Sequence, residues 1–181
     1  MNSVGSTGFW QRFDVLEQSL CLRVNRGCRY PVLRGFFAAV SRLGDGAAWY
    51  GLMLALALST PAGAAVAAQM ALTGAVGLAI YKLLKHRLVR ERPFMSHLGI
   101  EAGTAPLDRY SFPSGHTLHA VAFTLVATTH VPELWPVVAP FALLVAASRV
   151  VLGLHYPTDV AAGAVIGALL AQGSLLLWPA A

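Results

Sequence analysis

Charged side chains are scarce in this chain. Asp, Glu, Lys and Arg make up 12% of its 181 residues, whereas a soluble domain typically carries about 25%. Apolar residues reach 56%, so too few charges remain to cover a globule of this size with water-compatible surface. The shortage excludes a disordered chain and argues against an ordinary cytosolic enzyme.

Cysteine is also scarce. Cys21 and Cys28 are the only two; their spacing fits no zinc motif, and one pair cannot build a disulfide framework. Acidic residues are few as well, since 8 acidic against 13 basic side chains give a net charge of +5. Such a balance is typical of proteins that meet nucleic acid, anionic lipid headgroups or an anionic substrate.

Long apolar runs dominate what is present. A membrane-spanning helix needs about 20 apolar residues, and the matching runs are 62–84, 116–131, 134–152, 158–178 and a shorter or tilted 46–60. We interpret 31–43, which carries Arg34 and Arg42, as a short helix at the membrane surface. The sequence therefore predicts an all-α integral membrane helical bundle with about five transmembrane helices, in one membrane domain over 1–181 whose bundle covers 31–178.

The N-terminal segment 1–30 has a different pattern. Residues 1–30 lack the apolar run of a signal peptide. Apolar residues recur there at spacings of three and four, at Phe9, Phe13, Leu16, Leu20 and Val24. The pattern predicts an amphipathic helix over 9–24 that either lies in the membrane interface or packs on other protein.

The basic residues share one side of the predicted membrane topology. With five crossings, every Lys and Arg falls on the side that contains 85–113 and 153–157. The opposite side holds Glu133 and His130 without a basic residue. The positive-inside rule then favours a multi-pass protein of the cytoplasmic (inner) membrane with its basic side at the cytoplasmic face.

Three clusters of reactive residues lie at span ends on that basic side. They are Lys85–Pro93, Ser111–Thr117, and Ser148-Arg149 together with His155–Asp159. Arginine and lysine at one site suit a multiply charged oxyanion. Arg149 interrupts an apolar run, where a charge is costly, and is therefore a functional candidate.

The histidines add catalytic potential to these clusters. Ser114, Gly115 and His116 begin a helix whose first N–H groups attract an anion. His155 and Asp159 are four residues apart, so the carboxylate can hold Nδ1–H of the imidazole and leave Nε2 free to attack. Two histidines with different partners suggest one nucleophile and one general acid.

Other interpretations remain open for each cluster. The run Lys82–Arg92 can anchor a span, and a histidine at a helix start can be a packed polar residue. His116, His119, His155 and Asp159 can form a metal site. Because the surrounding lysine and arginine side chains would repel a cation, we predict that no metal binds there. We expect His119, one helical turn after His116, to serve packing.

The three clusters together resemble the signature of the type 2 phosphatidic acid phosphatase superfamily. The matching elements are Lys85-x6-Arg92-Pro93, Pro113-Ser114-Gly115-His116 and Ser148-Arg149-x5-His155-x3-Asp159. The resemblance implies a helical, metal-independent phosphatase without a cofactor. It also implies that His155 forms a phosphohistidine, that Asp159 orients His155, and that His116 protonates the leaving oxygen. The implied phosphate ligands are Lys85, Arg92, Ser114, Gly115 and Arg149.

The expected function is that of a membrane lipid phosphatase. Candidate substrates are phosphatidylglycerophosphate, phosphatidate and polyprenyl phosphates or diphosphates, with the bilayer as the other partner and no nucleic acid.

Two departures from the family stand out: comparable members commonly have six spans, and the active sites of the bacterial ones usually face outward. A vanadate-dependent haloperoxidase fits poorly because the chain is short. An anion-binding membrane transporter or scaffold without hydrolase activity would place its polar groups near mid-membrane rather than at one surface.

Overall fold

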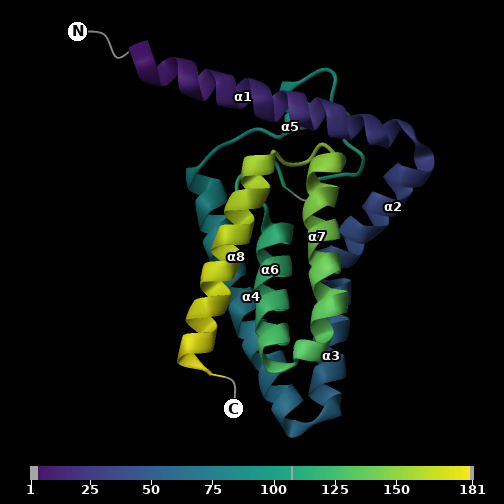
Figure 1. Cartoon of the computed structure of the whole chain (residues 1–181), viewed down its shortest axis with the longest axis vertical. Helices are drawn as coiled ribbons and strands as arrows, with labels where there is room; N and C mark the ends of the chain where they lie inside the picture. Colours follow the sequence, from purple (N-terminus) through teal and green to yellow (C-terminus); the bar gives the residue numbers. More distant parts are fainter. Residues whose placement is uncertain (1–3, 107, 180–181) are drawn as a thin grey trace.

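The computed structural model describes residues 4–106 and 108–179, which form a bundle of helices with one further helix lying across its end (Figure 1). The bundle helices are α3 (Ala48–Ser59), α4 (Pro61–Arg87), α6 (Gly115–His130), α7 (Trp135–Val151) and α8 (Pro157–Leu177). They coincide with the five predicted runs. Within the described residues the only β pairing is an isolated bridge between Glu91 and Tyr110, so the all-α prediction is confirmed.

The bundle helices differ in length. Three segments are long and apolar enough to cross a membrane: Pro61–Arg87, Pro132–Val151 and Pro157–Leu177. Helix α6 has 16 residues and α3 has 12, both shorter than a typical span of about 20. Helix α6 packs against α4, α7 and α8, and this central position explains why Leu118, Ala120, Ala122 and Val126 are fully buried.

Helix α2 (Pro31–Arg42) lies where the sequence predicts a short helix over 31–43, and most of its first residues are exposed. It packs along α7 and is joined to α3 by the π-helical turn η2 (Leu43–Ala47), within which the chain kinks at Gly46 (Figure 1). Two glycines allow this course. A Cβ on Gly44 would lie 2.5 Å from Val145 Cγ2, and Gly46 takes a φ of 146°, which side chains with a Cβ rarely adopt.

Helix α1 (Val4–Asn25) lies across the end of the bundle where α4 and α7 end and α6 and α8 begin (Figure 1). Its buried residues are Glu17, Cys21 and Asn25, whereas Val15, Leu16 and Leu20 are exposed. The predicted apolar face therefore points away from the bundle at Leu16 and Leu20, as an interfacial helix requires. The side chains of Phe9 and Phe13, predicted for the same face, lie outside the described residues.

Glycines bring α8 close to α6. A Cβ on Gly163 would lie 2.5 Å from the carbonyl oxygen of Ser114, and one on Gly167 would lie 2.3 Å from that of Leu118. Small residues at such positions let helix backbones approach closely. This contact sets the start of α8 beside the start of α6, and two of the three reactive clusters meet there.

The close contact predicts unequal effects for two glycine substitutions on α8. Gly167→Ala would force a methyl group against a backbone carbonyl, and overpacking of this kind costs about 1–3 kcal/mol. We expect the detergent-solubilised variant to unfold several degrees below the wild type in a thermal melt. A Cβ added at Gly173 would have no neighbouring atom within 4 Å, so Gly173→Ala is the matched control and should melt at or above the wild-type temperature. Equal melting temperatures for both variants would contradict the packing account.

Candidate active site

A cavity of about 470 Å³ opens between the ends of the bundle helices. Its polar end is lined by Asp45, Lys85, Arg92, Asp108, His116, Arg149 and His155. Farther along α3, α4 and α6 the wall becomes apolar, with Met53, Ala71, Gly74, Leu78 and Phe123. The cavity is therefore amphipathic, with its charged groups gathered at one end.

Two cations of the first cluster converge on one carboxylate. Lys85 Nζ lies 2.6 Å from Asp108 Oδ2, and Arg92 Nη2 donates to Asp108 Oδ1 at 2.7 Å. Burial alone would raise the pKa of Asp108, but the hydrogen bonds and charges of Lys85 and Arg92 outweigh it and hold the pKa below its ordinary value. Asp108 lies in the segment between α5 (Pro93–Ser96) and α6, and the sequence patterns do not single it out.

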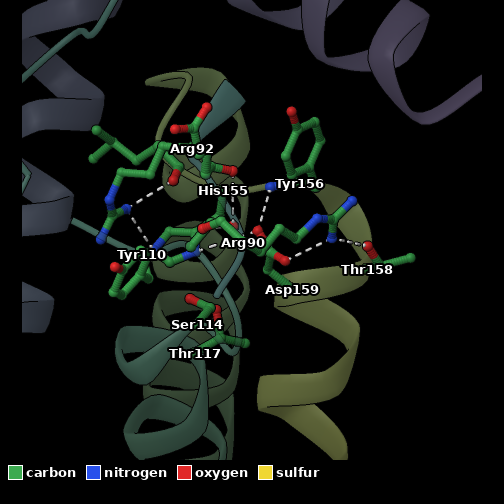
Figure 2. A network of polar contacts seen from close by, with 12 residues as sticks. Arg90, Arg92, Tyr110, Ser114, Thr117, His155, Tyr156, Thr158 and Asp159 are labelled. Atoms are coloured by element: carbon green, nitrogen blue, oxygen red, sulfur yellow. Dashed lines mark hydrogen bonds and ion pairs between the residues drawn. The ribbon is translucent and has the colours of Figure 1, made fainter. Parts of the chain in front are cut away.

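His155 lies between Arg92 and Asp159 (Figure 2). Its Nε2 is 3.1 Å from Arg92 Nη1. Its Nδ1 is 3.7 Å from Asp159 Oδ2, which is longer than a hydrogen bond. Burial, and then the charges of Arg149, Arg92 and Lys85, hold the pKa of His155 well below its ordinary value. The imidazole is therefore neutral, as a nucleophile must be.

His116 faces a second carboxylate that the sequence does not predict. Its Nε2 lies 3.3 Å from Asp45 Oδ1, and Asp45 belongs to the π-helical turn between α2 and α3. In the sequence, Gly44-Asp45-Gly46 indicates only a break between helices. The turn instead directs Asp45 into the cavity opposite the start of α6.

Arg149 is the most isolated cation of the site. It is 3% exposed, in the last turn of α7, and it donates to the Ser41 hydroxyl through Nη1. Its buried Nε has no hydrogen-bond partner. Among the described residues no carboxylate lies within ion-pair distance of Arg149, so no direct ion pair neutralises its charge at the cavity wall.

The remaining predicted residues take different positions. Gly115 lines the cavity. Ser114 is fully buried outside the lining, and its hydroxyl pairs with that of Thr117 at 3.0 Å (Figure 2). Asp159 is also fully buried, behind His155. His119 also lines the cavity, and its Nδ1 and Nε2 lie 2.9 and 3.1 Å from the carbonyl oxygens of Gly115 and Gly74.

Comparison with known proteins identifies the family. A family model described as the PAP2 superfamily matches residues 46–181. The chain belongs to the PAP2 superfamily. This is the type 2 phosphatidic acid phosphatase family that the signature indicated, and the protein is accordingly a multi-pass membrane phosphatase.

This PAP2 protein is also similar to individual known proteins. It is 40% identical over 132 residues to decaprenylphosphoryl-5-phosphoribose phosphatase of Mycolicibacterium smegmatis, covering 69% of this chain and 68% of that protein. It is 34% identical over 100 residues to undecaprenyl-diphosphatase BcrC of Bacillus subtilis, covering 55% of this chain and 51% of that one. The crystal structure of LpxE from Aquifex aeolicus matches with a TM-score of 0.75 at 26% identity, covering 86% of this chain and 92% of that chain.

The ion pairs of Asp108 generate a prediction for this PAP2 site. Because the pKa of Asp108 is lowered, the carboxylate is ionised at neutral pH and competes with an incoming anion for Lys85 and Arg92. Asp108→Asn removes this competitor, so we expect inhibition by inorganic phosphate to strengthen about tenfold, equivalent to about 1.4 kcal/mol. Glu101→Gln, an exposed change in the same segment, is the control. An unchanged inhibition constant in Asp108→Asn would contradict the competition.

Proposed function

We propose that this PAP2 protein hydrolyses a phosphate ester on a lipid whose tail stays in the bilayer. The observation that carries the proposal is the buried Arg149, which has no ion-pair partner among the described residues and lies at the charged end of an apolar-walled cavity. A buried cation without an ion-pair partner is costly, and a bound phosphate supplies a negative charge in direct contact. The apolar wall along α3, α4 and α6 suits the first part of a hydrocarbon tail.

The proposed reaction has two steps. The neutral Nε2 of His155 attacks phosphorus, and the bond between phosphorus and the lipid oxygen breaks. His116 gives its proton to that oxygen, and Asp45, which also lines the cavity, lies 3.3 Å from His116 Nε2. Water then attacks the phosphohistidine, His116 takes a proton from this water, and the bond from phosphorus to Nε2 breaks to release inorganic phosphate.

The cations serve the transition state of both steps. Lys85, Arg92 and Arg149 converge on the cavity end that His155 lines, where they can hold the phosphate oxygens as charge develops on them. Substrate phosphate replaces the Asp108 carboxylate at Lys85 and Arg92. Gly115 offers backbone at the start of α6, and buried Ser114 supports that turn from behind.

A polyprenyl-linked phosphate is the substrate class that we favour. Two relatives are named as phosphatases of decaprenyl- and undecaprenyl-linked phosphates. The lipid tail in such substrates would run along the apolar wall. We further propose that the site faces the cytoplasm, because the chain carries its lysine and arginine residues on that side of the predicted topology.

Phosphate release from detergent-purified protein in EDTA tests the proposal. A panel of polyprenyl phosphates, phosphatidate and phosphatidylglycerophosphate should yield phosphate with the highest kcat/KM for a polyprenyl phosphate. His155→Ala and His116→Ala should each lower kcat by at least about a thousandfold, since the nucleophile or the general acid is lost. The matched control is His86→Ala, an exposed histidine on α4. Activity retained in His155→Ala would contradict the mechanism.

Arg149→Lys tests the phosphate-binding role of the isolated cation. Lysine keeps the charge but loses the planar fork that binds two oxygens together. We expect kcat/KM to fall about a hundredfold, as for a lost transition-state donor, while the melting temperature changes little. Near-wild-type kinetics in this variant would exclude Arg149 as a phosphate ligand.

Reporter fusions at Ala181 test the orientation. The C-terminal end of α8 lies at the end of the bundle opposite the candidate site (Figure 1). If the site lies at the cytoplasmic face, the C-terminus lies outside the cytoplasm. A reporter enzyme that functions only outside the cytoplasm should then be active when fused at Ala181. A reporter active in the cytoplasm would reverse the proposed orientation.

A further inference from the structure

Glu17 is a buried carboxylate on α1, next to exposed apolar side chains. It is 6% exposed, whereas its neighbours Val15 and Leu16 on α1 are 62% and 66% exposed. A buried carboxylate is tolerated when it is paired and hydrogen-bonded. Glu17 therefore has partners in the bundle that α1 covers.

These partners lie at the start of α8 and in the segment after α4. Glu17 Oε2 lies 2.6 Å from Arg90 Nη2. Glu17 Oε1 accepts a hydrogen bond from the backbone N–H of Thr158 at 2.7 Å and another from the Thr158 hydroxyl. A carboxylate at this position also complements the positive end of the α8 dipole.

Arg90 continues the connection toward the candidate catalytic pair (Figure 2). Its Nη1 donates to Asp159 Oδ1 at 2.7 Å and to the Thr158 hydroxyl at 2.8 Å. Its guanidinium carbon lies 4.0 Å from the centre of the Tyr156 ring. The planar fork thus bridges two carboxylates while it stacks on an aromatic ring, which fixes its orientation.

Asp159 has both oxygens committed by this arrangement. Oδ1 binds Arg90, and Oδ2 accepts the backbone N–H of Tyr156 at 2.8 Å. The same Oδ2 lies 3.7 Å from His155 Nδ1. The distance between Asp159 and His155 therefore depends on where Arg90 holds the carboxylate, and Arg90 is itself held by Glu17.

We infer that Glu17 and Arg90 are positioning residues for the His155–Asp159 pair, and that α1 is consequently part of the catalytic unit. The inference rests on the proposed function. Glu17 lies outside residues 46–181, which the family model matches, and Arg90 is not a position of the three-part signature. Neither residue lines the cavity, so both act on the reaction through Asp159.

A double-mutant cycle in the full-length protein tests this inference. Glu17→Gln keeps the shape and an acceptor for Thr158 but loses the ion pair with Arg90. Arg90→Lys keeps the charge but cannot bridge two carboxylates. Each change should lower kcat on a polyprenyl phosphate about ten- to a hundredfold, because small misplacements of reacting groups are costly. KM and the inhibition constant of inorganic phosphate should stay within about twofold of wild type, because the cavity cations are untouched.

Coupling is the decisive readout of the cycle. If both residues act through one chain of contacts, the kcat of the double variant should be little lower than that of the less active single variant. Asp14→Asn, an exposed carboxylate on the same helix, is the control and should retain wild-type kinetics. If Glu17→Gln does not fold, Arg90→Lys alone must still show the fall in kcat without a change in phosphate inhibition.

Three results would overturn the inference: wild-type kcat in Glu17→Gln, additive losses in the double variant, or a parallel loss of phosphate binding, which would indicate a general structural role. These results differ from failure of the proposed function. In that case the wild-type protein itself would release no phosphate from any lipid of the panel, and the positioning role would fall with it.

Discussion

The structure depends on a guanidinium buried without a carboxylate partner among the described residues. Arg149 sits in the last turn of α7 at 3% exposure with the Ser41 hydroxyl as its protein partner. Removing an ion from water costs several kcal/mol, so the packing of α2 against α7 must hold this charge in place. Lys85 and Arg92 share one carboxylate, Asp108. The cavity end therefore has an excess of positive charge that a phosphate group can neutralise.

Helix packing brings the histidines and an apolar wall to this positively charged end of the cavity. The glycines of α8 allow a backbone contact with α6 that sets His155 beside the start of the helix carrying His116. The kinked passage from α2 through η2 into α3 brings Ser41 to Arg149 and Asp45 to His116. Apolar side chains of α3, α4 and α6 extend the same cavity into the bundle. A lipid that carries a phosphate complements both parts of this cavity, because its phosphate suits the cationic end and its hydrocarbon tail suits the apolar wall.

Much of this could be predicted from the sequence, because the cations, the histidines and Asp159 lie at fixed spacings near span ends. Three other carboxylates of the site and its surroundings could not. Glu17, Asp45 and Asp108 come from an N-terminal helix, a π-helical turn and an irregular segment, and no periodic pattern links such positions to the signature. The sequence indicates a surface helix at α2 because Arg34 and Arg42 are polar and Gly44-Asp45-Gly46 resembles a helix end. The chain does kink at that point, and Gly46 supplies the positive φ that the kink needs. The sequence does not predict that the same turn directs Asp45 into the cavity.

The central claim of the mechanism is that the phosphoryl group is transferred to Nε2 of His155 before water releases it. Acid-free rapid quenching with a polyprenyl phosphate labelled at phosphorus, followed by peptide mapping, tests it most directly. We predict a transient label on Nε2 of His155, which is absent in His155→Ala and persists longer when hydrolysis is slowed by His116→Ala. A label on His116, or turnover with no labelled intermediate at any quench time, would contradict the claim.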